Sequence, residues 1–308
     1  MKRIAVIGLG TMGPGIAARL ARGGIKVSAF DSSDAQIEKA RTALGPANDV
    51  LDRLGIERKA GGDVTFATSL ADAVKGADLV IENVPEKIEI KAEVYRALDG
   101  LIGKDTLVVS DTSGIPITKL QEHLSNPARF AGMHWSNPPH IIPMIEVISG
   151  EKTAPETAQA IVALIERLGL LPVVVKKDVP GFVENRILYA LLREAIDLVE
   201  EGVIAPEALD TCVSWGIGYK LSIIGPMALL DMAGLDIYHS VASFLNQELS
   251  TRKDIAPFIT KRVEAKRLGL KTGGGVYDYT PERSKELILE RARMLIAVRR
   301  ALEDEGTK

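Results

Sequence analysis

The residues with the clearest capacity for chemistry lie between 131 and 147, in the stretch AGMHWSNPPHIIPMIEV. His134 and Glu146 stand in two short apolar segments of this stretch, which a proline-containing excursion separates. Burying a carboxylate without a partner is costly, so we expect the two side chains to meet. An imidazole oriented by a carboxylate is a general base, and its ordinary pKa of about 6.5 allows proton transfer near neutral pH.

The same two residues also permit a structural interpretation. His134 would then be a core histidine with a satisfied hydrogen bond, and Glu146 would be a surface acid on an edge strand. The flanking residues alone leave both interpretations open. The choice depends on the elements that position the pair.

Composition sets the broad class of the protein. A chain of 308 residues with 46% hydrophobic content has room for two globular domains of about 150 residues each. The net charge of -3, and the lack of a basic run interleaved with aromatic residues, give no reason to expect nucleic-acid binding. The single cysteine, Cys212, excludes an intramolecular disulfide, and we predict that it packs in a core.

Metal and membrane functions are not indicated either. The four histidines show no HExxH spacing, so we predict no metal. The start, MKRIAVIGLG, has an apolar run too short for a signal peptide and is predicted to be a strand. No stretch approaches 18 uninterrupted apolar residues, so we expect a cytoplasmic protein that does not enter a membrane.

A dinucleotide-binding pattern opens the chain. The apolar run KRIAVI predicts a buried strand, and a helix with Pro14 near its start and Gly23-Gly24 at its end follows the loop. A second strand, IKVSAF, ends about 20 residues beyond the loop at an acid. The candidate cofactor-binding residues of the loop and the second strand are Gly8, Gly10, Thr11, Met12, Gly13 and Asp31.

Each of these residues has a physical role in holding a pyrophosphate and a ribose. Gly8 permits the tight turn, Gly10 permits close approach of the backbone, and Gly13 permits close helix packing. The helix N-terminus supplies oriented N–H groups to the anion. Asp31 would accept hydrogen bonds from the ribose hydroxyls, and its charge would repel a 2'-phosphate, which favours NAD over NADP.

The segments that follow carry further candidates and two structural alternatives. Residues 33 to 61 are predicted to form a pair of helices broken at Gly45-Pro46. Glu86 and Lys91 begin the helix after the strand ADLVIENV, either near the cofactor or as solvated helix charges. Ser113 ends the strand TLVVSDTSG, where open sheets place ligands, or it caps a helix that begins near Pro116.

The pattern changes near residue 180, beyond which we find helical periodicity and no convincing strand. Asn185 lies on the apolar stripe of a helix from about 181 to 201, where a buried amide needs a structural or a substrate partner. Trp135 and Trp215 are predicted to be packing residues. The remaining helices are expected near 206–216, 225–232, 235–249, 256–268 and 282–303.

From residue 2 to about 279, the chain resembles the 3-hydroxyacyl-CoA dehydrogenase family. GLGTMGPGIA looks like the family's cofactor loop, HWSNPP with IEV like its catalytic segment, and DVPGFVENR like the start of its helical domain. The resemblance implies an α/β fold, with a Rossmann-type, mostly parallel sheet domain over 1–180 that binds NAD. It also implies an all-helical C-terminal domain over 181–308 that forms a homodimer.

The resemblance also implies residue roles. His134 would take the proton of a substrate hydroxyl as hydride leaves for NAD, and Glu146 would hold the imidazole. Ser113 and Asn185 would bond the substrate oxygens, while Glu86 and Lys91 match positions that contact the cofactor. The residues that would line the substrate pocket are Trp135, Asn137 and His140.

Departures from the family pattern bear on the substrate. Members that act on acyl-CoA usually have phenylalanines after the catalytic histidine, whereas Trp135 and Ser136 stand here. Pro138-Pro139-His140 is more similar to members that oxidise small free carboxylates, such as carnitine or gulonate dehydrogenases. We therefore expect a compact carboxylate, with a 3-hydroxyacyl-CoA as the alternative. The run HWSNPPHIIPMIEVI resembles that of members that oxidise 5-formyl-3-hydroxy-2-methylpyridine-4-carboxylate, and this resemblance implies that compound as the substrate.

Two other classes of protein share part of the pattern. GLGTMG also occurs in 3-hydroxyisobutyrate and 6-phosphogluconate type dehydrogenases, but these use a lysine where Asn185 and Arg186 stand here. A dinucleotide-binding protein without turnover, like the crystallin relative of the family, is the non-enzymatic alternative. Retention of both His134 and Glu146 disfavours it.

Overall fold

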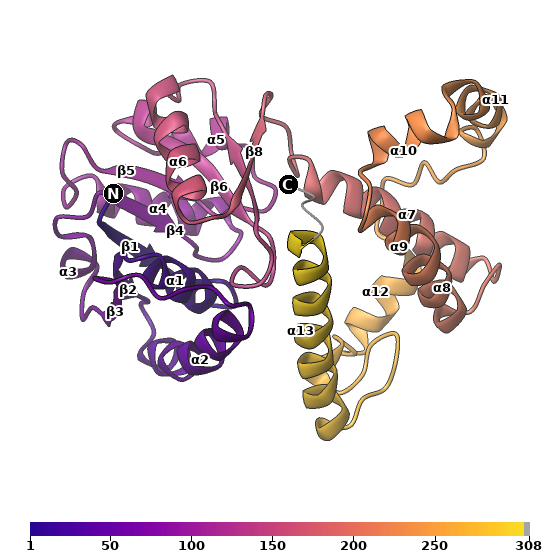
Figure 1. Ribbon diagram of the computed structural model, residues 1–308, viewed down its shortest axis with the longest axis horizontal. Coiled ribbons are helices and arrows are strands. Elements are labelled where there is room, and N and C mark those ends of the chain that lie inside the picture. Colours follow the sequence, from indigo (N-terminus) through magenta and orange to yellow (C-terminus); the bar gives the residue numbers. More distant parts are fainter. Residues whose placement is uncertain (305–308) are drawn as a thin grey trace. The chain divides into compact units, whose positions relative to one another are not determined.

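The computed structural model describes residues 1 to 304 of the chain. The chain divides into two compact units, Met1–Arg186 and Ile187–Lys308. The first unit contains the sheet and the second is helical (Figure 1).

The first unit is built on an eight-stranded sheet in the order β3-β2-β1-β4-β5-β6-β7-β8. Every neighbouring pair is parallel except β6 and β7, which are antiparallel. This is the mostly parallel α/β arrangement that the sequence predicts. The strands are β1 (Arg3–Ile7), β2 (Lys26–Phe30), β3 (Asp63–Phe66), β4 (Leu79–Glu82), β5 (Leu107–Ser110), β6 (Phe130–Trp135), β7 (Met144–Ile148) and β8 (Leu171–Val175).

Helices cover both faces of this sheet (Figure 1), which is why the central strands are apolar on both sides. In β1, Ile4 and Val6 pack in a core with α1 and α6, whereas Ala5 and Ile7 pack in a second core with α3, α4 and α5. The helices of this unit are α1 (Gly13–Arg22), α2 (Asp34–Arg53), α3 (Leu70–Val74), α4 (Ile88–Leu98), α5 (Ile117–Gln121), η1 (Pro127–Arg129) and α6 (Pro155–Arg167).

The prediction of two helices between 33 and 61 is wrong. A single helix, α2, runs through Pro46 from Asp34 to Arg53. Proline within a helix removes one hydrogen bond and costs about 3 kcal/mol. Ala47 and Leu51, which follow the proline, are buried together against Ala18 of α1, and this packing offsets the local cost.

The second unit contains helices and two isolated β-bridges within the described residues. A turn with a short 3-10 helix, η3 (Leu270–Thr272), occupies the glycine-rich segment before the last helix. A π-helix, η2 (Val213–Gly218), joins α8 to α9. The α-helices are α7 (Glu184–Glu200), which begins in the first unit, α8 (Pro206–Cys212), α9 (Tyr219–Leu221), α10 (Pro226–Ala233), α11 (Leu235–Leu245), α12 (Pro257–Glu264) and α13 (Pro281–Asp304).

Among residues 1 to 304, no single helix is long and apolar enough to cross a membrane. One sharply bent pair, Pro206–Leu221 with Pro226–Ala233, passes the same test of length and composition when taken together.

The expectation that Cys212 and Trp215 pack in a core is wrong for a single copy of the chain. Cys212 is exposed, and Trp215 is 76% exposed. Between residues 187 and 304, Ala256 and Ile296 are the apolar side chains that reach full burial. The helices of this unit therefore enclose little core of their own.

Candidate active site

The glycine loop after β1 has the shape that a dinucleotide requires. Gly8 has a φ of +95°, and a Cβ there would lie 2.4 Å from the carbonyl oxygen of Asn83. A Cβ on Gly13 would lie 2.5 Å from the oxygen of Gly8, whereas one on Gly10 would meet nothing within 4 Å. Two glycines are thus required by the fold, and the third leaves open space where a pyrophosphate would approach. The residues present fit NAD.

The remaining loop residues complete this cradle. Thr11 is exposed, and Met12 stands at the start of α1 without capping the helix through its side chain, so the first N–H groups are available to an anion. Asp31, directly after β2, accepts hydrogen bonds from the N–H groups of Leu9 (2.8 Å) and Ser33 (2.9 Å). Each carboxylate oxygen keeps a second lone pair for a ribose hydroxyl.

Asn83 is a residue of this region that the sequence interpretation missed. Its side-chain amide donates to the oxygen of Gly8 at 3.2 Å and so fixes the glycine turn from β4. The signal was its place at the end of the apolar strand ADLVIENV, directly beside the carboxyl end of β1.

Lys91 and Glu86 serve the architecture around the site. Lys91 is fully buried, and its ammonium lies 2.8 Å from Glu82 and 3.5 Å from Glu86, so the alternative of a solvated helix charge is wrong for it. Glu82, a buried acid that the sequence interpretation missed, also accepts hydrogen bonds of 2.6 Å from Tyr95 and Ser110. This network ties α4 to β4 and β5.

Glu86 holds the turn that carries Ser113. Its Oε1 accepts hydrogen bonds from the hydroxyl of Thr112 (2.6 Å) and from the N–H groups of Ser113 (3.0 Å) and Gly114 (2.9 Å). The Ser113 hydroxyl is left exposed at the end of β5. The interpretation of Ser113 as a helix cap is wrong, because Asp178 accepts the first N–H groups of α5 instead.

Asn185 is brought to the same turn. Its side-chain amide donates to the carbonyl oxygen of Ser113 at 2.7 Å. The start of α7 is therefore fastened to the end of β5, and the amide of Asn185 has a structural partner.

His134 and Glu146 meet. They are directly opposed in the antiparallel pair of β6 and β7, and the Nδ1 of His134 lies 2.8 Å from the Oε2 of Glu146. The exposed fractions are 6% for His134 and 1% for Glu146. The interpretation of Glu146 as a surface acid on an edge strand is wrong, since β7 lies between β6 and β8.

The second oxygen of Glu146 is also held. It accepts hydrogen bonds from the N–H groups of Val183 (2.9 Å) and Glu184 (3.2 Å) at the start of α7. Burial raises the pKa of Glu146, but the bonds from His134, Val183 and Glu184 outweigh it and hold that pKa below its usual range. Glu146 is therefore a fixed anion.

The electrostatic surroundings of His134 favour its cation. Burial lowers the pKa of His134, but the hydrogen bond to Glu146 and the charges of neighbouring carboxylates, Glu146 and Glu184 among them, outweigh burial, so the pKa stands above its ordinary value. An acceptor on Nδ1 fixes the tautomer and turns the other nitrogen, Nε2, toward a reacting group.

Asp111 is a second buried acid beside His134 that the sequence interpretation missed. Its Oδ1 accepts the N–H of Trp135 at 2.8 Å. Burial raises the pKa of Asp111 to about 8, although that hydrogen bond and the charge of His134 oppose the rise. Asp111 therefore carries a proton at neutral pH. The polar sequence SDTS at the end of β5 gave a signal for this residue.

Glu184 is a third acid at the site. Its Oε1 accepts the hydroxyl of Ser136 at 2.6 Å, and within residues 1 to 304 its buried Oε2 has no hydrogen-bond partner. His134, Glu146 and Glu184 each present one polar atom within 4.8 Å of the others. The sequence interpretation missed Glu184 because one acid near the start of a helix is ordinary.

The three residues expected to line a substrate pocket differ in their burial and in their neighbours. Trp135 is 1% exposed and packs in the core beside α1 and α6, which confirms its interpretation as a packing residue. His140 lies against α1, since a Cβ on Gly15 would come within 2.8 Å of its Nδ1. Burial lowers the pKa of His140, and Asn137 is exposed.

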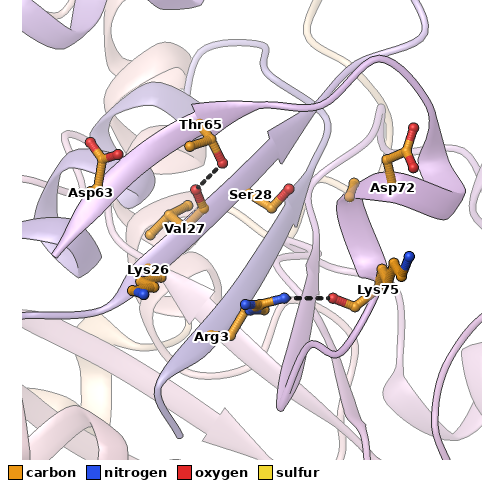
Figure 2. A pocket seen from close by; sticks show the side chains of 9 residues that line it. Arg3, Lys26, Val27, Ser28, Asp63, Thr65, Asp72 and Lys75 are labelled. Atoms are coloured by element: carbon orange, nitrogen blue, oxygen red, sulfur yellow. Dashed lines mark hydrogen bonds between the residues drawn. The ribbon is translucent and has the colours of Figure 1, made fainter. Parts of the chain in front are cut away.

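A hollow of about 400 Å³ lies elsewhere on the same sheet (Figure 2). Arg3, Lys26 and Asp63, which line it, are the first residues of β1, β2 and β3. Parallel sheets bind ligands at the carboxyl ends of their strands, where the glycine loop and Ser113 stand. The hollow is thus at the opposite end of these strands from the candidate site.

Comparison with protein families gives matches over both parts of the chain. Residues 3–179 match the NAD binding domain of 3-hydroxyacyl-CoA dehydrogenase, and residues 181–279 match its C-terminal domain.

Individual relatives cover nearly the whole chain. It is 68% identical to the 5-formyl-3-hydroxy-2-methylpyridine 4-carboxylate 5-dehydrogenase of Mesorhizobium japonicum, with 98% of this chain and 99% of the relative covered. It is 35% identical to a probable 3-hydroxybutyryl-CoA dehydrogenase of Bacillus subtilis, with 92% and 99% covered.

The chain also matches a solved structure with a TM-score of 0.96. That structure is of a 5-formyl-3-hydroxy-2-methylpyridine 4-carboxylic acid 5-dehydrogenase, which is described as an NAD+ dependent dismutase. Its sequence identity is 68%, and 98% of this chain and 99% of that chain are covered.

Proposed function

The chain belongs to the 3-hydroxyacyl-CoA dehydrogenase family, and we propose that it oxidises 5-formyl-3-hydroxy-2-methylpyridine 4-carboxylate or a close analogue with NAD+. It is an NAD-dependent oxidoreductase. The observation that carries the substrate proposal is the 68% identity over 98% of the chain to an enzyme named for that compound. Trp135 and Ser136, in place of the phenylalanines usual in members that act on acyl-CoA, support it.

His134 is the proposed base. Its Nδ1–H donates to Glu146 at 2.8 Å, which leaves Nε2 free to take the proton of a hydroxyl on the substrate carbon. Glu146, held by the N–H groups of Val183 and Glu184, orients the ring and stabilises the imidazolium that forms. In the reverse direction, the same nitrogen returns the proton to the carbonyl oxygen.

The cofactor is assigned to the glycine loop. Gly8, Gly10, Thr11, Met12 and Gly13 would hold the pyrophosphate at the start of α1, and Asp31 would bind the adenosine ribose. When bound, NAD+ supplies the hydride acceptor. Glu86 fixes the turn after β5 that would face the nicotinamide, and the ammonium of Lys91 lies 3.5 Å from Glu86. Both are therefore proposed to support the cofactor site.

Ser113 and Asn185 are proposed to bind the substrate oxygen on which His134 acts. The exposed hydroxyl of Ser113 is held in place through Glu86, and Asn185 is fastened to the same turn at 2.7 Å. Asn137 and His140 would border the remainder of the substrate, with Trp135 as the buried wall behind them.

A 3-hydroxyacyl-CoA is the second candidate substrate, and the 35% identical Bacillus subtilis relative favours it. The third possibility, a dinucleotide-binding protein without turnover, is disfavoured by the intact hydrogen-bonded pair of His134 and Glu146.

A direct assay of activity on each compound distinguishes the two substrate assignments. Acid formation from the pyridine aldehyde with NAD+ is followed by chromatography, because the aldehyde can also reoxidise NADH. In parallel, reduction of acetoacetyl-CoA with NADH is followed as absorbance at 340 nm. We expect the aldehyde to react with a kcat/KM above about 10⁴ M⁻¹s⁻¹ and acetoacetyl-CoA to react less efficiently, by a factor on the order of 10². Efficient reduction of acetoacetyl-CoA would overturn the substrate assignment, and binding of NADH without product from either compound would indicate the non-enzymatic alternative.

We also propose that the helical unit forms a homodimer. It exposes many large apolar side chains, among them Trp215 and Met232 at 76% and Met227 at 70%. Surfaces of this kind usually mark interaction sites. Light scattering should give twice the mass of one chain, and a mass that stays monomeric at micromolar concentration would contradict the proposal.

A further inference from the structure

Oxidation of an aldehyde to an acid needs a step that oxidation of an alcohol does not need. An alcohol carries a C–H and an O–H on one carbon, so one base is sufficient for its oxidation. An aldehyde carries the C–H but no O–H, and water must first add to its carbonyl group to give a hydrate. A site that oxidises aldehydes to acids therefore gains from a second base that can deprotonate this water.

The structure assigns Glu184 as the residue that activates this water, an inference that rests on the proposed function. Its carboxylate lies at the site of the pair, because His134, Glu146 and Glu184 each present a polar atom within 4.8 Å of the others. One oxygen is fixed by the hydroxyl of Ser136 at 2.6 Å. The other oxygen is buried and, in the described part of the chain, has no hydrogen-bond partner.

An unpartnered carboxylate oxygen in a buried setting is costly unless a ligand or a water satisfies it. The other acids nearby are not available for this task. Glu146 has both oxygens bonded, to His134 on one side and to Val183 and Glu184 on the other. Asp111, with its pKa near 8, is protonated at neutral pH and is no base there.

Glu184 and His134 together account for both protons that move when water adds to the aldehyde. Glu184 takes one proton from water as the water oxygen bonds to the aldehyde carbon. His134, starting as the cation, gives the proton on Nε2 to the carbonyl oxygen. The products are the hydrate, a neutral His134 and a protonated Glu184, and no electrons are transferred.

This order of events explains why two carboxylates flank one imidazole. The charges of Glu146 and Glu184 favour the cation of His134, which hydration consumes as an acid. Hydration leaves His134 neutral, the state that is needed to take a proton from the hydrate in the oxidation itself. A single imidazole thus serves both steps in sequence.

Oxygen exchange measures hydration without any cofactor. In H₂¹⁸O, and with no nucleotide present, the wild-type protein should accelerate incorporation of ¹⁸O into the aldehyde, as followed by mass spectrometry. Glu184→Gln, which keeps the shape and removes the charge, should lose this acceleration by a factor on the order of 10², the ordinary contribution of a general base. Glu166→Gln, the same change at an exposed position of α6, is the matched control and should exchange like wild type.

Steady-state kinetics give a second readout. Glu184→Gln should make acid from the aldehyde on the order of 10² more slowly. Its reduction of the aldehyde with NADH needs no hydrate and should reach the wild-type plateau at low pH. Glu184→Asp, which keeps the charge on a shorter side chain, provides an independent variant and should lose part of the oxidation only.

Three outcomes would overturn the assignment. The first is exchange of ¹⁸O by Glu184→Gln at the wild-type rate. The second is an equal loss of oxidation and of the low-pH reduction plateau in both Glu184 variants, which would indicate a structural role. The third is the absence of acid from the aldehyde with the wild-type protein, and this result alone would also overturn the proposed function.

Discussion

His134 and Glu146 face each other across the one antiparallel pair of the sheet, β6 and β7, with 2.8 Å between Nδ1 and Oε2. The opposition is a consequence of register, because directly paired residues in antiparallel strands point to the same side. The proline-containing excursion between the strands sets this register. A shift of one residue would turn one side chain to the other face of the sheet and separate the pair.

The pH dependence of the wild-type enzyme follows from the environment of His134. Its pKa is raised, so the ring is neutral only above a pH higher than the ordinary value of about 6.5. Oxidation of an alcohol, for example the hydroxymethyl analogue of the aldehyde, needs the neutral ring and should rise through this pKa. Reduction with NADH needs the cation and should fall through it. Rates measured from pH 5 to 10 in both directions test this, and parallel profiles would contradict it.

Replacement of Glu146 by glutamine should slow alcohol oxidation by about 10² to 10⁴, as neutralising the carboxylate of such a pair does in other enzymes. It should also move the apparent pKa of His134 downward, because the hydrogen bond and the charge of Glu146 both raise that pKa. The measurement is the pH profile of kcat for Glu146→Gln beside wild type. A slower enzyme with an unmoved apparent pKa would show that Glu146 does not act through His134.

Asp111 makes stability depend on pH. The unfolded chain should lose this proton near pH 3.9, whereas the folded protein keeps it to about pH 8. The folded state therefore binds more protons between these values, and its stability falls as pH rises, by up to about 1.4 kcal/mol per pH unit. Asp111→Asn removes this dependence and can still accept the N–H of Trp135.

We expect the advantage in Tm of Asp111→Asn over wild type to grow from pH 5 to pH 8. Calorimetry at several pH values measures it. A difference in Tm that is constant with pH would show that Asp111 ionises alike in the folded and unfolded chains.

Sequence alone predicted the parts of the fold and site that depend on local chemistry. Gly8, Gly13 and Asp31 are required by a tight turn and by hydrogen bonds between neighbouring elements, so their pattern carries the information. The pairing of His134 with Glu146 could be predicted because a carboxylate in an apolar strand demands a partner. The fold class could be predicted for the same reason, because strands alternate with helices along the first part of the chain, and the structure confirms it.

What the sequence did not predict depends on long-range packing. Pro46 lies inside a continuous helix because residues that follow it pack against α1. Glu184 and Asp111 meet His134 only when α7 and β5 converge on β6, and no local pattern records that meeting. Trp215 looked like a core residue from its type, yet one copy of the helical unit leaves it exposed.

The central claim is that His134 is the base, and the rate of His134→Asn tests it most directly. Asparagine can keep a hydrogen bond to Glu146 but cannot take up a proton near neutral pH. We expect acid formation from the pyridine aldehyde with saturating NAD+ to fall by at least about 10³, beyond the usual effect of one lost hydrogen bond, while NADH binds with unchanged Kd. A His134→Asn enzyme that turns over within tenfold of wild type would contradict the account.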